Sequence, residues 1–167
     1  MSRNTLAYRV GGRRVPSVTE ALALSGVVDL SAIPEGVLEA ARQRGSDVHG
    51  WLEALDLGLL DDDQQPDDRI EGYVRAYARF RIESGFVPAR IEEVVLDELH
   101  MFAGTIDRTG TLRGGREVLI DIKTSQTIGP EVGLQLAGYA LALDPKAERT
   151  AAMPRFALQL ASHGSYA

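Results

Sequence analysis

The chain contains no cysteine, which excludes disulfides, zinc ribbons and cysteine-ligated iron–sulfur clusters. It also has no run of about 18 apolar residues, the length that a membrane-spanning helix needs. The first residues, Met1-Ser2-Arg3-Asn4, do not lead into the apolar stretch of a secretory signal. We therefore expect a protein that has no membrane contact and works in the reducing cytoplasm.

Lysine is scarce, because 2 of the 18 basic residues are Lys and 16 are Arg. Positions without a special demand are thus filled by arginine, which makes Lys123 conspicuous. An ammonium group is a compact charge that can release a proton, whereas a guanidinium stays protonated, so a site that moves protons favours lysine. The alternative is that Lys123 is an ordinary solvated residue on an edge strand.

The net charge of −6 argues against a protein that coats nucleic acid through bulk charge, but it permits local DNA binding. The acidic run at 61–68 lacks the glycine and distal glutamate of a calcium loop, so we interpret it as a solvated connector.

Sequence patterns predict helices first, then strands, a helix and another strand. The predicted helices cover 17–24, 34–57, 70–82 and 131–143, and the second is expected to break and restart at Gly45-Ser46, which places His49 in a first turn. The predicted strands cover 90–97, 101–107, 117–123 and 155–160, with turns at 107–110 and 113–115. This order predicts one α/β domain over 1–167, with a helical part at about 17–84 and a mixed sheet flanked by helices at about 88–161.

The predicted strand at 118–123 carries a candidate site. Side chains alternate along a strand, so Asp121 and Lys123 share one face while Ile120 and Ile122 enter a core. A hairpin would bring Asp107 beside them. Two carboxylates and one ammonium can hold a divalent cation beside a proton-handling amine, which is what phosphodiester hydrolysis requires.

Two helical pairs with a spacing of four join this group. His49 and Glu53 would share one helical face, as would Gln135 and Tyr139. A capping or surface histidine and an amphipathic surface pair are the alternatives for these residues.

The motifs together resemble a known family. They are Arg44-Gly45-Ser46-Asp47-Val48-His49, Gly104-Thr105-Ile106-Asp107-Arg108, Asp121-Ile122-Lys123-Thr124 and Gln135-Leu136-Ala137-Gly138-Tyr139. Their order and spacing resemble those of the PD-(D/E)XK nuclease superfamily with its restriction-endonuclease-like core. More narrowly, they resemble its RecB-like exonuclease branch, which includes stand-alone phage enzymes.

The resemblance implies a role for each residue. His49, Asp107, Asp121 and the backbone carbonyl of Ile122 would hold a metal ion, and Lys123 would orient or deprotonate the attacking water. The residues implied in DNA contact are Gln135, Tyr139, Arg44, Arg108 and Thr124. Glu53, Glu92 and Glu93 are further candidates, although a solvent-facing strand position is the expectation for the last two.

The implied activity is a DNA nuclease dependent on Mg²⁺ or Mn²⁺, without the iron–sulfur cluster that some relatives carry. An exonuclease acting on linear DNA in phage or prophage recombination, repair or processing is expected, in a bacterial host or phage-infected cell. The chain has no helicase region, so self-association or a recombination partner would supply processivity. Alternatives are an endonuclease of the same fold, a silent nucleic-acid-binding module, or an interaction protein without catalysis.

Overall fold

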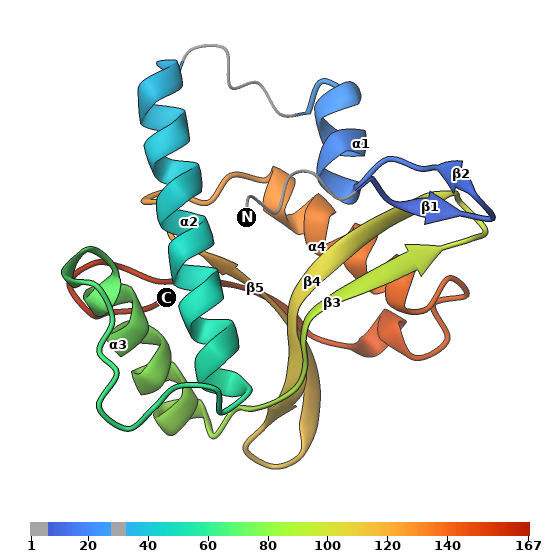
Figure 1. Ribbon diagram of the computed structural model, residues 1–167. Coiled ribbons are helices and arrows are strands. Elements are labelled where there is room, and N and C mark those ends of the chain that lie inside the picture. Colours follow the sequence, from blue (N-terminus) through green and yellow to red (C-terminus); the bar gives the residue numbers. More distant parts are fainter. Residues whose placement is uncertain (1–6, 28–32) are drawn as a thin grey trace.

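The computed structural model describes residues 7–27 and 33–167, and the first residues of the chain, where no signal was expected, lie outside these ranges. Its centre is a four-stranded mixed sheet with helices on both faces (Figure 1). The strands are β3 (Val87–Asp97), β4 (Phe102–Leu112), β5 (Arg116–Lys123) and β6 (Arg155–Gln159), in the spatial order β3-β4-β5-β6. β3, β4 and β5 are antiparallel neighbours, and β6 runs parallel to β5. The predicted α/β fold is therefore confirmed.

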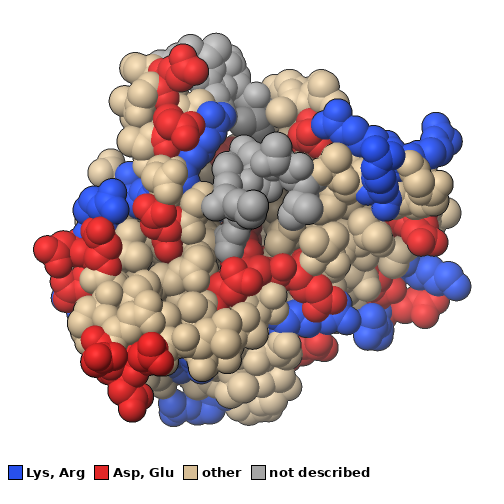
Figure 2. Space-filling model, viewed as in Figure 1, with Lys and Arg blue, Asp and Glu red and all other residues tan. Residues whose placement is uncertain are grey.

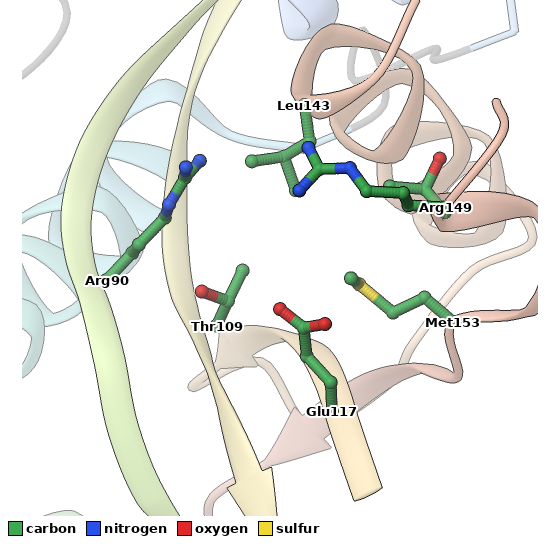
Figure 3. Close-up of a pocket in the computed structure, with 7 residues that line it drawn as sticks. Arg90, Thr109, Glu117, Leu143, Arg149 and Met153 are labelled. Atoms are coloured by element: carbon green, nitrogen blue, oxygen red, sulfur yellow. The ribbon is translucent and has the colours of Figure 1, made fainter. Parts of the chain in front are cut away.

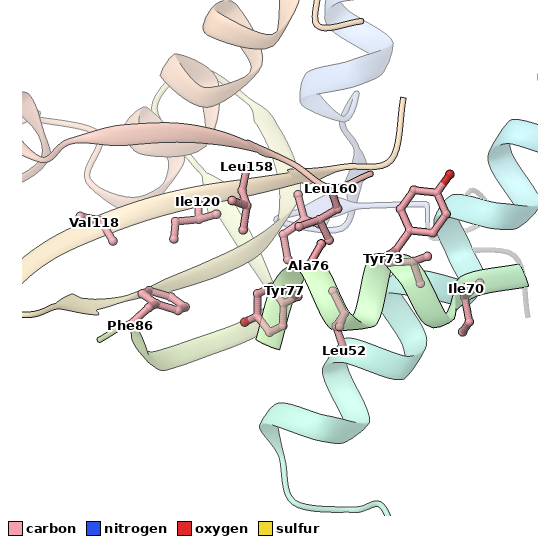
Figure 4. Packing of buried hydrophobic residues seen from close by; sticks show 12 residues of the cluster. Leu52, Ile70, Tyr73, Ala76, Tyr77, Phe86, Val118, Ile120, Leu158 and Leu160 are labelled. Carbon is pink, nitrogen blue, oxygen red and sulfur yellow. The ribbon is translucent and has the colours of Figure 1, made fainter. Parts of the chain in front are cut away.

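Two helices cover one face of the sheet. α2 (Glu35–Asp56) and α3 (Asp68–Ser84) bury Leu52 and Tyr77 against Ile120 and Ile122 of β5. Figure 4 shows Leu52, Tyr73, Ala76 and Tyr77 directed toward Val118, Ile120, Leu158 and Leu160. This core confirms the inward direction predicted for Ile120 and Ile122.

The opposite face carries α1 (Val18–Leu24) and α4 (Glu131–Leu143), and the short 3₁₀ helix η2 (Thr150–Ala152) precedes β6. Ser17 caps α1 through the predicted capping box, and α4 has the predicted bounds. A small hairpin of β1 (Arg9–Val10) and β2 (Arg13–Arg14), which was not predicted, packs Val10 and Val15 against Ala103.

Two local predictions were wrong. α2 runs without a break through Gly45-Ser46, so His49 lies in the middle of a long helix. Of the two segments predicted to mark the turn, 107–110 lies inside β4, whereas the chain reverses at 113–115 as predicted. None of the helices in the described ranges is both long and apolar enough to cross a bilayer.

Candidate metal and catalytic site

The site forms where α2 and α4 approach the middle of β4 and the end of β5. β3 and β4 pair Ile91 with Arg108 and Glu93 with Ile106, which sets Glu92 opposite Asp107 between these pairs. Asp107 Oδ2 accepts a hydrogen bond of 2.6 Å from the backbone nitrogen of Ile122. The predicted proximity of Asp107 to the 121–123 segment is therefore present in the structure.

His49 reaches this group from α2. Its Nδ1 lies 3.1 Å from Glu92 Oε1 and 3.5 Å from Asp107 Oδ1, and its Nε2 lies 3.1 Å from the carbonyl oxygen of Ile122. His49, Glu92 and Asp107 form a cluster whose ligand atoms all lie within 4.8 Å of one another. One imidazole among carboxylate and carbonyl oxygens is a donor set that suits Mg²⁺, Mn²⁺ and related divalent ions.

Asp121 supplies a further carboxylate on the same side. Its side chain is 2 % exposed, and Oδ2 lies 2.8 Å from Lys123 Nζ without forming a hydrogen bond to any described residue. Burial, followed by the nearby charge of Asp107, raises the pKa of Asp121 to about 6. The Lys123 ammonium compensates the charge of this buried carboxylate, so a carboxylate and an amine lie together near Asp107 and His49.

Lys123 is fixed from α4. Its Nζ donates to Gln135 Oε1 at 2.9 Å, and Gln135 Nε2 donates to the hydroxyl of Tyr139 at 2.9 Å. Burial and the charge of Asp107 raise the pKa of the Tyr139 hydroxyl, so Tyr139 remains a neutral donor. The predicted helical pair Gln135 and Tyr139 is thus a connected chain of hydrogen bonds that ends on the lysine.

Two glycines allow α4 to lie close to β4 and to α1. A Cβ atom on Gly104 would lie 2.5 Å from Tyr139 Cε1, and one on Gly138 would lie 2.9 Å from Val18 Cγ1. These distances are too short for any side chain, so the absence of a Cβ at Gly104 lets the Tyr139 ring pack directly against the backbone of β4.

The glutamates expected to face solvent differ from each other. Glu93 is exposed and pairs with Arg90 at 3.6 Å, in agreement with the expectation. Glu92 has a side chain that is 5 % exposed and a backbone φ of 48°, which turns its carboxylate toward His49. The strand pattern missed this because alternation applies only to regular β conformation. Glu53 lies one turn beyond His49 on α2 and is half-buried.

The residues implied in DNA contact also differ in how accessible they are. Thr124 follows Lys123 and lies near Gly45 of α2, at the rim of a cavity of about 360 Å³. Arg44 is half-buried on α2, with a buried Nε that has no hydrogen-bond partner among the described residues. Arg108 is fully buried and bonded to Asp56 and Glu92, so its guanidinium does not reach the surface where DNA would lie.

A second cavity, of about 50 Å³, lies apart from these residues. Figure 3 shows Arg90, Thr109, Glu117, Leu143, Arg149 and Met153 around it. This cavity contains one acidic side chain, and none of the residues of the His49 cluster lines it. We therefore assign the chemistry to the His49 cluster.

Comparison with known proteins agrees with this geometry. The family model described as the PD-(D/E)XK nuclease superfamily matches residues 62–163. The match spans more than half of the chain and includes Asp107, Asp121, Lys123, Gln135 and Tyr139, whereas His49 lies before it. No curated protein matches the chain. The chain belongs to the PD-(D/E)XK nuclease superfamily.

Proposed function

We propose that this protein is a Mg²⁺- or Mn²⁺-dependent deoxyribonuclease of the RecB-like type, acting as an exonuclease on linear DNA. The observation that carries the proposal is the cluster of His49, Glu92 and Asp107, with Asp121 and Lys123 forming an ion pair of 2.8 Å next to it. His49, Glu92, Asp107, Asp121 and the carbonyl of Ile122 would hold the metal ion. The bound ion would neutralise the phosphate and lower the pKa of water.

Lys123 is the proposed proton-handling residue. An ammonium group has three N–H donors, of which one is used by Gln135 and one faces Asp121 at 2.8 Å. At least one N–H direction therefore remains for the attacking water or for a phosphate oxygen. Gln135 and Tyr139 fix the amine in place, so the lysine needs little reorganisation when the substrate binds.

Basic side chains outside the matched segment favour a nucleic-acid substrate. Arg9, Arg13 and Arg14 are exposed on the β1–β2 hairpin, and Figure 2 shows blue side chains gathered over this hairpin. The hydroxyl of Tyr8, next to the hairpin, lies 2.8 Å from Thr105 Oγ1, two residues before Asp107. The hairpin is thereby tied to the strand that carries the site, where its arginines can hold a phosphate backbone.

The direct test is cleavage of end-labelled single-stranded, double-stranded linear and closed circular DNA with Mg²⁺, Mn²⁺ or EDTA. Metal-dependent loss of the linear substrates alone is the expected result. Cutting of the circles would replace the exonuclease assignment with an endonuclease, and no cleavage with either ion would contradict the proposal.

The proposed role in phage or prophage DNA recombination, repair or processing can be tested separately. A recombination partner, or self-association of this chain, should increase the length of DNA degraded in each binding event. We expect a processivity assay on long linear DNA to depend on protein concentration or on the added partner.

A further inference from the structure

A buried arginine connects the candidate metal cluster to the far end of α2. The side chains of Arg108 and Asp56 are both 0 % exposed, and Arg108 Nε donates to Asp56 Oδ2 at 2.7 Å. Arg108 Nη1 donates to Glu92 Oε1 at 2.9 Å and to the carbonyl oxygen of Asp107. One guanidinium therefore touches two residues of the metal cluster and one residue outside it.

Asp56 is fixed on its other sides. The hydroxyl of Tyr77 donates to Asp56 Oδ2 at 2.7 Å, and Arg81 Nη1 donates to Asp56 Oδ1 at 2.8 Å. Both partners come from α3, so Asp56 links α2 to α3 and also accepts the hydrogen bond from Arg108. The carboxylate thus sets where the guanidinium lies.

Stability alone is a poor explanation for this arrangement. Buried ion pairs contribute little net stability, since apolar residues of similar volume are often as good or better. Arg108 also leaves Nη2 buried without a hydrogen-bond partner among the residues that the structure describes, which adds a cost. What the guanidinium does achieve is geometric, because it fixes a Glu92 carboxylate that leaves the strand at φ 48°.

We propose that Arg108 and Asp56 are positioning residues that hold Glu92, and through it His49, in the arrangement that receives the metal ion. The positioning follows from Glu92 Oε1, because that atom contacts both Arg108 Nη1 and His49 Nδ1. The expected effect on metal binding rests on the proposed function. A lysine at position 108 would keep the positive charge, but one amine cannot reproduce the planar fork that reaches Asp56 and Glu92 together.

The test compares Arg108→Lys with Arg81→Met as a matched control. Arg81→Met removes the other ion pair of Asp56, which spans 2.8 Å, without touching Glu92. The first readout is the Mn²⁺ dissociation constant, measured by electron paramagnetic resonance well below the melting temperature of each variant. We expect at least tenfold weaker binding in Arg108→Lys and less than a twofold change in Arg81→Met.

The second readout needs no metal. The chain has three histidines, so the ring signals of His49, His100 and His163 can be resolved by NMR in EDTA at one pH. Arg108→Lys should shift the His49 signals, while His100, which contacts Asp97 at 2.8 Å, should stay in place. Arg81→Met should shift neither.

Wild-type Mn²⁺ affinity and an unchanged His49 signal in Arg108→Lys would overturn the inference. Equal losses in both variants would also overturn it, because they would indicate general destabilisation. If the wild type bound no Mn²⁺ but the His49 signal moved as expected, the positioning role would stand and the metal-dependent function would fail.

Discussion

Asp121→Asn should stabilise the metal-free protein at neutral pH. Burial raises the pKa of Asp121 from an ordinary value near 3.8 to about 6, so its ionised form is disfavoured in the fold. That difference corresponds to about 3 kcal/mol of unfolding free energy, which sets the upper limit of the gain. A realistic gain is about 1–3 kcal/mol, because the amide weakens the contact with Lys123.

The sign follows from proton binding. The folded protein holds the Asp121 proton more tightly than the unfolded chain does, so protonation of this group favours the fold. Its contribution is favourable at about pH 4 and is lost as the pH rises through about 6. The stability difference between Asp121→Asn and wild type should therefore be small at pH 4 and largest above pH 7.

The assay is urea unfolding in EDTA, followed by circular dichroism at pH 4.5, 6 and 7.5. Asp97→Asn is the matched control, since Asp97 is equally buried in β3 but accepts a 2.8 Å hydrogen bond from the backbone nitrogen of His100. We expect no gain from this control. An Asp121→Asn variant that is no more stable than wild type at pH 7.5 would contradict a raised pKa of Asp121 in the folded protein.

Two further predictions concern packing and DNA contact. Gly104→Ala should push Tyr139 away from β4, lower the stability by about 1–3 kcal/mol and reduce cleavage. Its control is Gly133→Ala in α4, where a Cβ meets nothing within 4 Å, so stability should be unchanged or rise by up to about 1 kcal/mol; equal melting temperatures of the two variants would contradict the prediction. Replacing Arg9 and Arg13 by Gln should lower the slope of log affinity for DNA against log salt by about 1–2, because neither arginine is ion-paired within the described residues. The control Arg116→Gln, near the β4–β5 turn, should leave the slope unchanged. An unaltered slope in the hairpin variant would show that the hairpin does not contact the DNA.

The predictable parts of the fold had local signals. The capping box at Ser17 and the glycine at position 85, with φ 66° at the end of α3, are short-range features, and the structure has both. The alternation of Asp121 and Lys123 with Ile120 and Ile122 likewise needed no knowledge of distant contacts.

The failures arose where tertiary contacts decide. Gly45-Ser46 does not break α2, because Val48 and Leu52 beyond it are fully buried against the sheet and its helices, which outweighs the cost of a helical glycine. The sequence predicts a turn at Gly110, but a Cβ there would lie 2.2 Å from the carbonyl oxygen of Val87. This glycine permits close strand pairing instead.

The candidate site was only partly readable for the same reason. Asp107, Asp121 and Lys123 lie on adjacent strands, so a hairpin was enough to bring them together. The bonds of Arg108 to Asp56 and Glu92 join residues 52 and 16 positions apart and depend on how α2 docks on the sheet. A regular strand pattern also gives no sign of the left-handed backbone at Glu92.

The decisive experiment for the proposed role of Lys123 compares cleavage of linear DNA with Mn²⁺ by wild type, Lys123→Ala and Lys146→Ala. The two variants remove the two lysines of the chain one at a time, and Lys146 is exposed in the loop after α4. We expect metal-dependent cleavage by wild type and Lys146→Ala, and a loss of at least a hundredfold in Lys123→Ala with its fold intact. Cleavage by Lys123→Ala at the wild-type rate, or cleavage by wild type that persists in EDTA, would contradict this expectation.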